Sequence, residues 1–153
     1  METQPVYRRV LVKLSGEALG GTDGIFDNAR LEEICAQLKR IADLGTEVAV
    51  VIGAGNIWRG ARQAGLHIDR VRGDHMGMLA TVINSLAVQD YLLKAGLETE
   101  VLSAIPMAQV CGVYDQYKAD ALLRAGKAVI IACGVGYPYF STDTGMVLRA
   151  AEL

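Results

Sequence analysis

Short apolar runs alternate with segments of helical periodicity along this 153-residue chain. Four runs, bounded by glycine or by polar turns, predict buried strands at residues 8–14, 47–52, 99–103 and 128–133. Apolar positions with a period near 3.6 predict helices between these strands. The helices are expected from 27 or 28 to a C-cap at 45, from about 74 to 94, from 115 to 124, and from 142 or 143 to the last residue.

This order of elements predicts an α/β domain of three layers: a doubly wound, mainly parallel sheet with helices on both faces. In sheets of this kind, ligands bind beyond the carboxyl ends of the strands. Three loops that contain glycine follow predicted strands, after Leu14, after Ile52 and after Cys133. We therefore expect these three loops to meet and to form one site.

The helix expected to begin at Asp74 is apolar almost all round its axis between Met76 and Leu93. A helix of this kind is covered on all sides, by its own core or by a second subunit. Its most apolar stretch is interrupted by Thr81, Asn84 and Ser85. No apolar run reaches the 18 residues of a membrane span, so no membrane partner is expected.

Composition and charge narrow the class of protein. Hydrophobic residues make up 52% of the chain and charged residues 21%, which suits a sheet buried on both faces or a large subunit interface. The net charge of −2 provides no general attraction for nucleic acid. One local basic cluster is either a solvated face or a site for a small anion: Arg59, Arg62, Arg70 and Arg72.

The cysteines carry no sign of a metal site or a disulfide framework. Cys35, Cys111 and Cys133 are far apart, and none belongs to a CxxC or Cys/His cluster. Free thiols are therefore expected, and no metal ligands are assigned. The segment before the first strand is short and polar, unlike a signal peptide, so we expect a cytoplasmic protein.

The first strand ends in Lys13-Leu14-Ser15-Gly16. A lysine in an otherwise apolar strand needs an anionic partner, because an unpaired buried ammonium is costly. A phosphate held by the N–H groups near Gly16 would be such a partner. Alternatively, Lys13 reaches solvent or a neighbouring carboxylate. The segment is not a P-loop, since GxxxxGK[ST] is absent.

The second glycine loop, residues 53–56, is followed by Arg59, whose planar guanidinium can bind a phosphate in a bidentate manner. Asp74 is either the N-cap of the long helix or an acceptor for ribose hydroxyls. The third loop, residues 134–143, combines glycines and a proline with aromatic and hydroxyl side chains. It is either an ordinary core loop with a capping sequence or the wall of a nucleobase site.

Five segments resemble, in order and in spacing, the motifs of bacterial uridylate kinases in the amino acid kinase superfamily. They are residues 10–19, 51–60, 74–84, 103–107 and 140–144. The resemblance extends from Tyr7 to Leu153, about the first two thirds of the family's length. It implies an amino acid kinase fold in which residues 1–153 form the N-terminal, UMP-binding lobe. The ATP-binding C-terminal lobe would be absent from this chain.

The resemblance also implies roles for individual residues. Lys13 and Asp143 would be catalytic. ATP would bind Lys13, Leu14, Ser15, Gly16, Gly55 and Arg59. UMP would bind Ala54, Asp74, Val135, Gly136, Tyr137, Pro138, Tyr139, Phe140, Ser141 and Thr142. Mg²⁺ would arrive with ATP rather than occupy a protein-built metal site.

By this resemblance, the protein would be an allosteric enzyme that transfers the γ-phosphoryl group of ATP to UMP, giving UDP and ADP, in de novo pyrimidine nucleotide biosynthesis. GTP activation, UTP inhibition and a homo-hexamer are further implications. Two alternatives remain open at this point. One is a related kinase acting on a small carboxylate or phosphate, and the other is a nucleotide-binding module without turnover. The 153 residues alone are expected to be inactive.

Overall fold

The computed structural model describes residues 5–22, 24–60 and 66–153. In chain order its elements are β1 (Arg9–Leu14), the 3₁₀ turn η1 (Gly16–Leu19), α1 (Asn28–Asp43), β2 (Glu47–Ile52), α2 (Arg70–Lys94), β3 (Thr99–Ser103), β4 (Gly112–Val113), α3 (Gln116–Arg124), β5 (Ala128–Ala132) and α4 (Thr142–Glu152). The expected strands and helices are all present. Two elements, η1 and β4, were not predicted, because they are too short to show a period.

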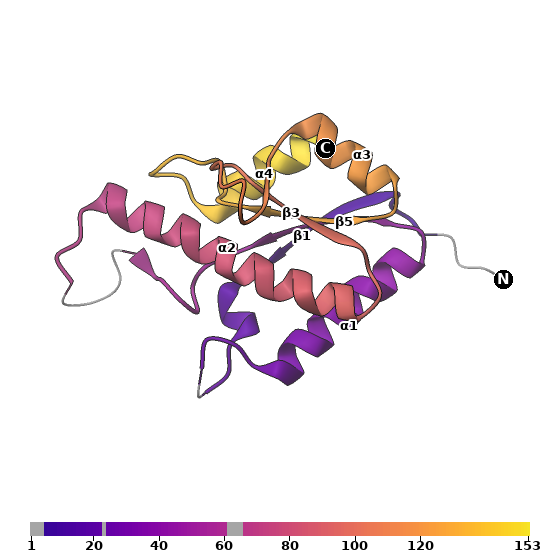
Figure 1. Cartoon of the computed structure of the whole chain (residues 1–153), viewed down its shortest axis with the longest axis horizontal. Helices are drawn as coiled ribbons and strands as arrows, with labels where there is room; N and C mark the ends of the chain where they lie inside the picture. Colours follow the sequence, from indigo (N-terminus) through magenta and orange to yellow (C-terminus); the bar gives the residue numbers. More distant parts are fainter. Residues whose placement is uncertain (1–4, 23, 61–65) are drawn as a thin grey trace.

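The five strands form one sheet in the order β1-β2-β5-β3-β4, and every pairing is parallel. The connections through α1 and α2 both advance in one direction across the sheet, whereas the connection through α3 returns. Right-handed crossovers therefore place α1 and α2 on one face and α3 on the other. Because α4 packs on β1 and β2 beside α3, the fold has three layers, as Figure 1 shows. The predicted fold class is confirmed.

The central strands β2 and β5 supply side chains to two hydrophobic cores. Val48, Val50 and Ile52 belong to the core beneath α1 and α2, while Ala49 and Val51 belong to the core beneath α3 and α4. This alternation follows from the two-residue period of a strand. Because both faces are buried, the sequence of β2 reads as a continuous apolar run. The expectation of a doubly covered sheet is therefore correct.

Two helix starts differ from the sequence prediction. The long helix α2 begins at Arg70, one turn earlier than expected, and its N-cap is Asp69, which accepts from the amides of Val71 and Arg72. Asp74 is consequently inside the helix and is not a cap. At α4, the cap is Ser141 rather than Thr142 or Asp143. In both cases an earlier side chain satisfies the free N–H groups of the first turn.

The helix α2 buries one face and exposes the other. Met76, Leu79 and Ile83 are 39%, 52% and 47% exposed and follow one another at helical spacing. We call these three residues the α2 stripe. By length and composition α2 could also cross a membrane, but 44% of its most apolar window is buried in the fold. The fold of this chain therefore covers only part of α2.

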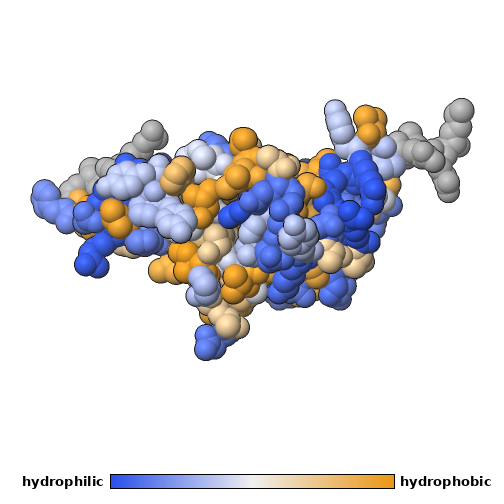
Figure 2. Space-filling model, turned by 90° about the horizontal axis from the view of Figure 1, so that it is seen from above, coloured by the Kyte–Doolittle hydropathy of each residue, from blue (hydrophilic) through white to orange (hydrophobic). Residues whose placement is uncertain are grey.

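The opposite side of the molecule is mixed in polarity. Figure 2 looks onto the side of α3 and α4 and shows hydrophobic side chains gathered in its middle, between two more polar ends. On α4, Val147 and Leu148 are exposed. The three cysteines are free thiols, as expected. Within the described residues, no cluster of three or more His, Cys, Asp or Glu side chains could hold a metal ion.

Candidate active site

The loops after β1 and β2 are in direct contact at the carboxyl edge of the sheet. The parallel register pairs Leu14 with Ile52, and the amide of Gly53 donates to the Leu14 carbonyl at 2.8 Å. A side chain at Gly16 would lie only 2.7 Å from both the Gly53 carbonyl oxygen and the Gly55 nitrogen. Glycine is therefore required at position 16, because two backbone segments approach each other there.

A pair of asparagines supports this junction from below. Asn84, fully buried in α2, donates to the Gly53 carbonyl at 2.7 Å and to the Asn56 side chain at 2.8 Å. Asn56 in turn donates to the carbonyl of Ile25 at 2.8 Å. The loop after β2 is thus tied both to α2 and to the segment before α1.

The two loops form the floor of a cavity of about 570 Å³. We call it the Lys13 cavity; it is lined by Lys13, Ser15, Gly16, Glu17, Gly53, Ala54, Gly55, Arg59, Ser141, Thr142 and Asp143. The ammonium of Lys13 lies 3.3 Å from a carboxylate oxygen of Asp143, at the start of α4. Of the two interpretations left open for Lys13, the structure therefore shows the second: its side chain is 34% exposed and pairs with a neighbouring carboxylate.

A second pair of charges lies in the same cavity. Glu17 accepts a hydrogen bond from the Ser15 hydroxyl and lies 3.5 Å from the guanidinium of Arg59. The Ser15 hydroxyl, the Glu17 amide and the charge of Arg59 together lower the pKa of Glu17. Arg59 also donates to the Gly55 carbonyl at 3.0 Å. Each cation of this cavity therefore faces a carboxylate.

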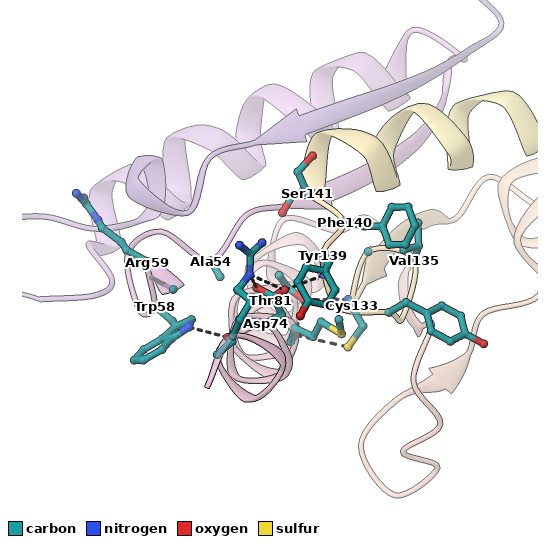
Figure 3. A pocket seen from close by; sticks show the side chains of 18 residues that line it. Ala54, Trp58, Arg59, Asp74, Thr81, Cys133, Val135, Tyr139, Phe140 and Ser141 are labelled. Carbon is teal, nitrogen blue, oxygen red and sulfur yellow. Dashed lines mark hydrogen bonds and ion pairs between the residues drawn. The ribbon is translucent and has the colours of Figure 1, made fainter. Parts of the chain in front are cut away.

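A second cavity, of about 350 Å³, opens beside the first. We call it the Asp74 cavity. Its walls come from the loop after β2, from α2 and from the loop after β5. Figure 3 shows Trp58 and Arg59 on one side and Phe140 and Val135 on the other, with Asp74 and Tyr139 between them.

Asp74 is held by groups from two distant parts of the chain. Its carboxylate accepts from Arg70 at 2.9 Å and from the backbone amide of Tyr139 at 2.8 Å. Partial burial acts to raise the pKa of Asp74, but these hydrogen bonds and the Arg70 charge lower it overall. The stability that ionised Asp74 contributes is complete above its usual pKa and is lost as the pH falls through the lowered one. At neutral pH, Asp74 is therefore an anion in the cavity wall.

The loop after β5 is fastened at its base. Cys133, the first residue after β5, has a φ of 64°, which L-residues seldom adopt. Its amide donates to the Thr81 hydroxyl on α2 at 2.9 Å. On the other face of the sheet, the guanidinium of Arg149 donates to the Gly134 carbonyl at 3.2 Å and stacks 4.0 Å over the Tyr114 ring. The loop is thus held by one side chain from each helical layer.

Most residues to which the resemblance assigned a binding role line one of the two cavities. Five of the six ATP residues line the Lys13 cavity, whereas Leu14 packs against the hydrophobic core. Eight of the ten UMP residues line the Asp74 cavity; the two that do not are Gly136 and Pro138. Of the basic cluster, Arg59 and Arg70 line this cavity, Arg72 does not, and Arg62 lies outside the described residues.

Four supporting residues received no role in the sequence analysis. Trp58 donates to the Gly73 carbonyl at 2.7 Å and so joins the loop after β2 to the first turns of α2. The other three are Thr81, Asn84 and Arg149. For Thr81 and Asn84, the sequence offered one signal of a supporting role: each is a polar side chain in an apolar helix. Buried polar groups require hydrogen-bond partners.

The two cavities meet at a common rim. Ala54, Arg59, Ser141 and Thr142 line both of them. The two cavities therefore adjoin, and groups bound in them would lie next to each other at this rim. The arrangement suits transfer between two bound molecules, with cationic side chains available for an anionic group at the rim.

Comparisons with known proteins show which proteins this chain is similar to. The profile of the amino acid kinase family matches residues 8–153. The uridylate kinase of Brucella anthropi is 51% identical over 154 residues, which cover 100% of this chain and 64% of that protein. The uridylate kinase of Brucella abortus gives the same identity and coverage. The chain therefore spans less than two thirds of the length of these curated relatives.

Solved structures show the same architecture. UMP kinase from Ureaplasma parvum superposes with a TM-score of 0.90 at 35% identity, covering 95% of this chain and 64% of that one. UMP kinase from Bacillus anthracis superposes with a TM-score of 0.91 at 42% identity, covering 95% of this chain and 61% of that one. The sheet and its helices are those of the corresponding part of these enzymes.

Proposed function

This chain belongs to the amino acid kinase family, and on that premise we propose that it forms the UMP-binding part of a uridylate kinase. The reaction transfers the γ-phosphoryl group of ATP to the phosphate of UMP and yields UDP and ADP, a step in de novo pyrimidine nucleotide biosynthesis. Its relatives from Brucella anthropi and Ureaplasma parvum are a uridylate kinase and a UMP kinase, which supports this activity. The enzyme acts in the cytoplasm.

The common rim of the two cavities carries the proposal. Phosphoryl transfer needs an acceptor oxygen and the transferred phosphorus in line, and most of the rate enhancement comes from this positioning and from charge stabilisation. UMP occupies the Asp74 cavity with its phosphate toward Arg59. The ATP phosphates occupy the Lys13 cavity, which shares Arg59 with the first.

Lys13 and Asp143 perform complementary tasks at the phosphates. The ammonium of Lys13 stabilises the negative charge that spreads over the transferred group. Asp143 orients Lys13 through their 3.3 Å contact. No protein nucleophile is required, because an oxygen of the UMP phosphate attacks directly.

Magnesium would be carried by ATP. Mg²⁺ commonly binds one or two carboxylates together with substrate phosphates, and the exposed carboxylate of Asp143 in the Lys13 cavity fits such a role. The ion would neutralise charge on the transferred group.

On the acceptor side, Asp74 accepts hydrogen bonds from the ribose hydroxyls, and the loop after β5 encloses the uracil. Asp74 is suited to this role because it is ionised at neutral pH and lines the cavity. Val135, Tyr139 and Phe140 supply the apolar and aromatic wall. Thr142 and Ser141 lie at the common rim, where the UMP phosphate is expected.

A substrate panel with the native protein tests the proposal. ADP release should depend on UMP and should not occur with aspartate, glutamate or carbamate as the acceptor. Turnover on one of these carboxylates would favour a different kinase of the family. Nucleotide binding without turnover on any acceptor would favour a binding module. GTP and UTP added to the same assay test our further proposal that they activate and inhibit the enzyme.

The 153 residues by themselves should bind UMP weakly and should not phosphorylate it. The residues proposed to bind UMP lie within this chain, but the chain covers only 64% of the Brucella anthropi enzyme. We propose that the adenine of ATP is bound by a C-terminal lobe beyond these residues. Calorimetry with UMP and a coupled assay for ADP release test both statements. ADP release that depends on UMP would show that the chain is a complete kinase.

We further propose that α2 packs against a second subunit in a homo-oligomer, a hexamer in the assembled enzyme. The α2 stripe offers an apolar surface at helical spacing. Ile83→Glu should break this contact. A charge at Leu86 would instead disturb the fold of the subunit itself, because Leu86 packs against its own hydrophobic core. Sedimentation of the native protein should show at least a dimer. A monomer at micromolar concentration would contradict the proposal.

A further inference from the structure

In the structure, the carboxylate of Glu17 interacts with Ser15 and Arg59, two of the residues that the proposed function assigns to the ATP phosphates. One oxygen accepts from the Ser15 hydroxyl, and the other faces the Arg59 guanidinium at 3.5 Å. A hydroxyl and a guanidinium are donors that a phosphate group uses in proteins. The cavity is therefore an anion site that the chain itself fills.

The carboxylate also covers the glycine where a phosphate would come closest to the backbone. A side chain at Gly55 would overlap both oxygens of Glu17. The Glu17 carboxylate thus lies directly over the backbone of the loop after β2. A phosphate that approached Gly55 and Arg59 would meet this negative charge at contact distance, and the repulsion would weaken its binding.

Glu17 can leave this position at little cost. Its side chain is 49% exposed and that of Arg59 is 62% exposed, so that solvent replaces their weak ion pair when the two separate. Neither side chain belongs to a hydrophobic core. Rotation of the Glu17 side chain alone would therefore free Ser15, Gly55 and Arg59 without any change in the fold.

We propose that Glu17 is an internal competitor for the donor phosphates: its carboxylate fills the Ser15–Gly55–Arg59 site in the empty protein and leaves when a phosphate group binds. This inference rests on the proposed function, because it regulates access to the same site. While no nucleotide is present, the ion pair with Glu17 holds Arg59 at the cavity. The same carboxylate lowers the affinity of the site for phosphates, because it must leave before they bind.

Calorimetry with metal-free pyrophosphate tests the proposal on this chain, with no acceptor and no turnover. Glu17→Gln preserves the size of the side chain and removes its charge. It should bind pyrophosphate about three- to tenfold more tightly than the parent chain. Glu98→Gln is the matched control: it removes the same charge from a 75% exposed side chain at the amino end of β3, opposite the site. This variant should bind as the parent chain does.

A second variant separates direct competition from a general charge effect. In an Arg59→Gln background, the gain from Glu17→Gln should shrink, because carboxylate and phosphate no longer share the guanidinium. An undiminished gain would overturn the proposal. Equal or weaker pyrophosphate binding by Glu17→Gln would overturn it too, as would the absence of binding by both chains. Because none of these measurements uses UMP or turnover, a failure here is distinguishable from a failure of the kinase proposal, which the substrate panel tests.

Discussion

The Asp74 cavity is fastened by hydrogen bonds to buried elements, whereas the Lys13 cavity is lined by pairs of exposed charges. At the Asp74 cavity, Thr81 and Arg149 hold the base of the loop after β5, and the Asp74 carboxylate holds the Tyr139 amide. At the Lys13 cavity, the contacts are Lys13 with Asp143 and Glu17 with Arg59, all partly exposed. Only the first set depends on packing.

The difference corresponds to the chemistry proposed for each side. A nucleobase and a ribose are recognised by fixed walls and fixed acceptors, so that ordering the loop before binding increases affinity. Phosphates are recognised by charge, and exposed ion pairs contribute little to folding stability. Substitutions at the Asp74 cavity should therefore affect stability and UMP binding together. Substitutions at the Lys13 cavity should affect catalysis and leave the fold intact.

Lys13→Ala should give the largest effect on activity. It removes a preorganised cation from the developing charge, at a cost of about 3–4 kcal/mol, or about 10²–10³-fold in turnover. Thermal unfolding should be little changed, because Lys13 is 34% exposed. Lys127→Ala is the control: its side chain is 33% exposed and pairs with Glu98 and Glu100 at the far edge of the sheet. Turnover of Lys13→Ala close to the parent value would contradict its catalytic role.

At the Asp74 cavity, Thr81→Val should have the largest effect, on both stability and UMP binding. Valine has nearly the same shape but leaves the buried Cys133 amide without its 2.9 Å acceptor, which costs about 1–3 kcal/mol of unfolding free energy. The KM for UMP should rise as the loop loosens, and that for ATP should not. Urea unfolding and steady-state kinetics measure the two effects.

The control for Thr81→Val is Ser85→Ala, one turn further along α2. Ser85 is also fully buried, but its hydroxyl donates to the Thr81 carbonyl inside the same helix. Its loss should therefore leave the KM for UMP unchanged. If Thr81→Val lowers stability without raising this KM, the base of the loop does not determine UMP binding.

Periodicity in the sequence predicted the sheet because its central strands are buried on both faces and read as apolar runs. The layer arrangement followed from the alternation of elements. The start of α2 was placed wrongly, because the residues before Met76 are mostly charged or small and show no apolar period. Asp69, not Asp74, caps the helix, and only the backbone geometry distinguishes the two.

The supporting contacts of the site could not be predicted from periodicity. Thr81 and Cys133 are 52 positions apart in the chain, and Asp74 and Tyr139 are 65 apart. Their pairing depends on β5 being inserted between β2 and β3, which brings the loop after β5 over α2. The resemblance supplied candidate residues for the cavities but gave no role to Glu17, since a single exposed carboxylate has no pattern.

Asp74→Asn should raise the KM for UMP moderately and leave the KM for ATP unchanged. Asparagine can still accept from the Tyr139 amide, but it loses the charge that pairs with Arg70 and that would hold the ribose hydroxyls. The KM for UMP should rise about tenfold, as for the loss of one hydrogen bond to a charged group, while the KM for ATP should not change. Asp69→Ala is the control, since it removes only the helix cap. Equal small changes in both constants would assign Asp74 a structural role alone.

Asp143→Asn should have the smallest effect on stability. It therefore tests most directly whether the ion pairs of the Lys13 cavity contribute less to folding than the hydrogen bonds of the Asp74 cavity. The Lys13–Asp143 contact joins side chains that are 34% and 70% exposed, and such pairs contribute about 0–1 kcal/mol to folding. The unfolding free energy should fall by less than about 0.5 kcal/mol, as for Asp43→Asn, which breaks an exposed pair with Lys39 on α1. Turnover should fall only for Asp143→Asn. If its stability falls as much as that of Thr81→Val, ion pairs do fasten the Lys13 cavity, and the distinction between the two cavities fails.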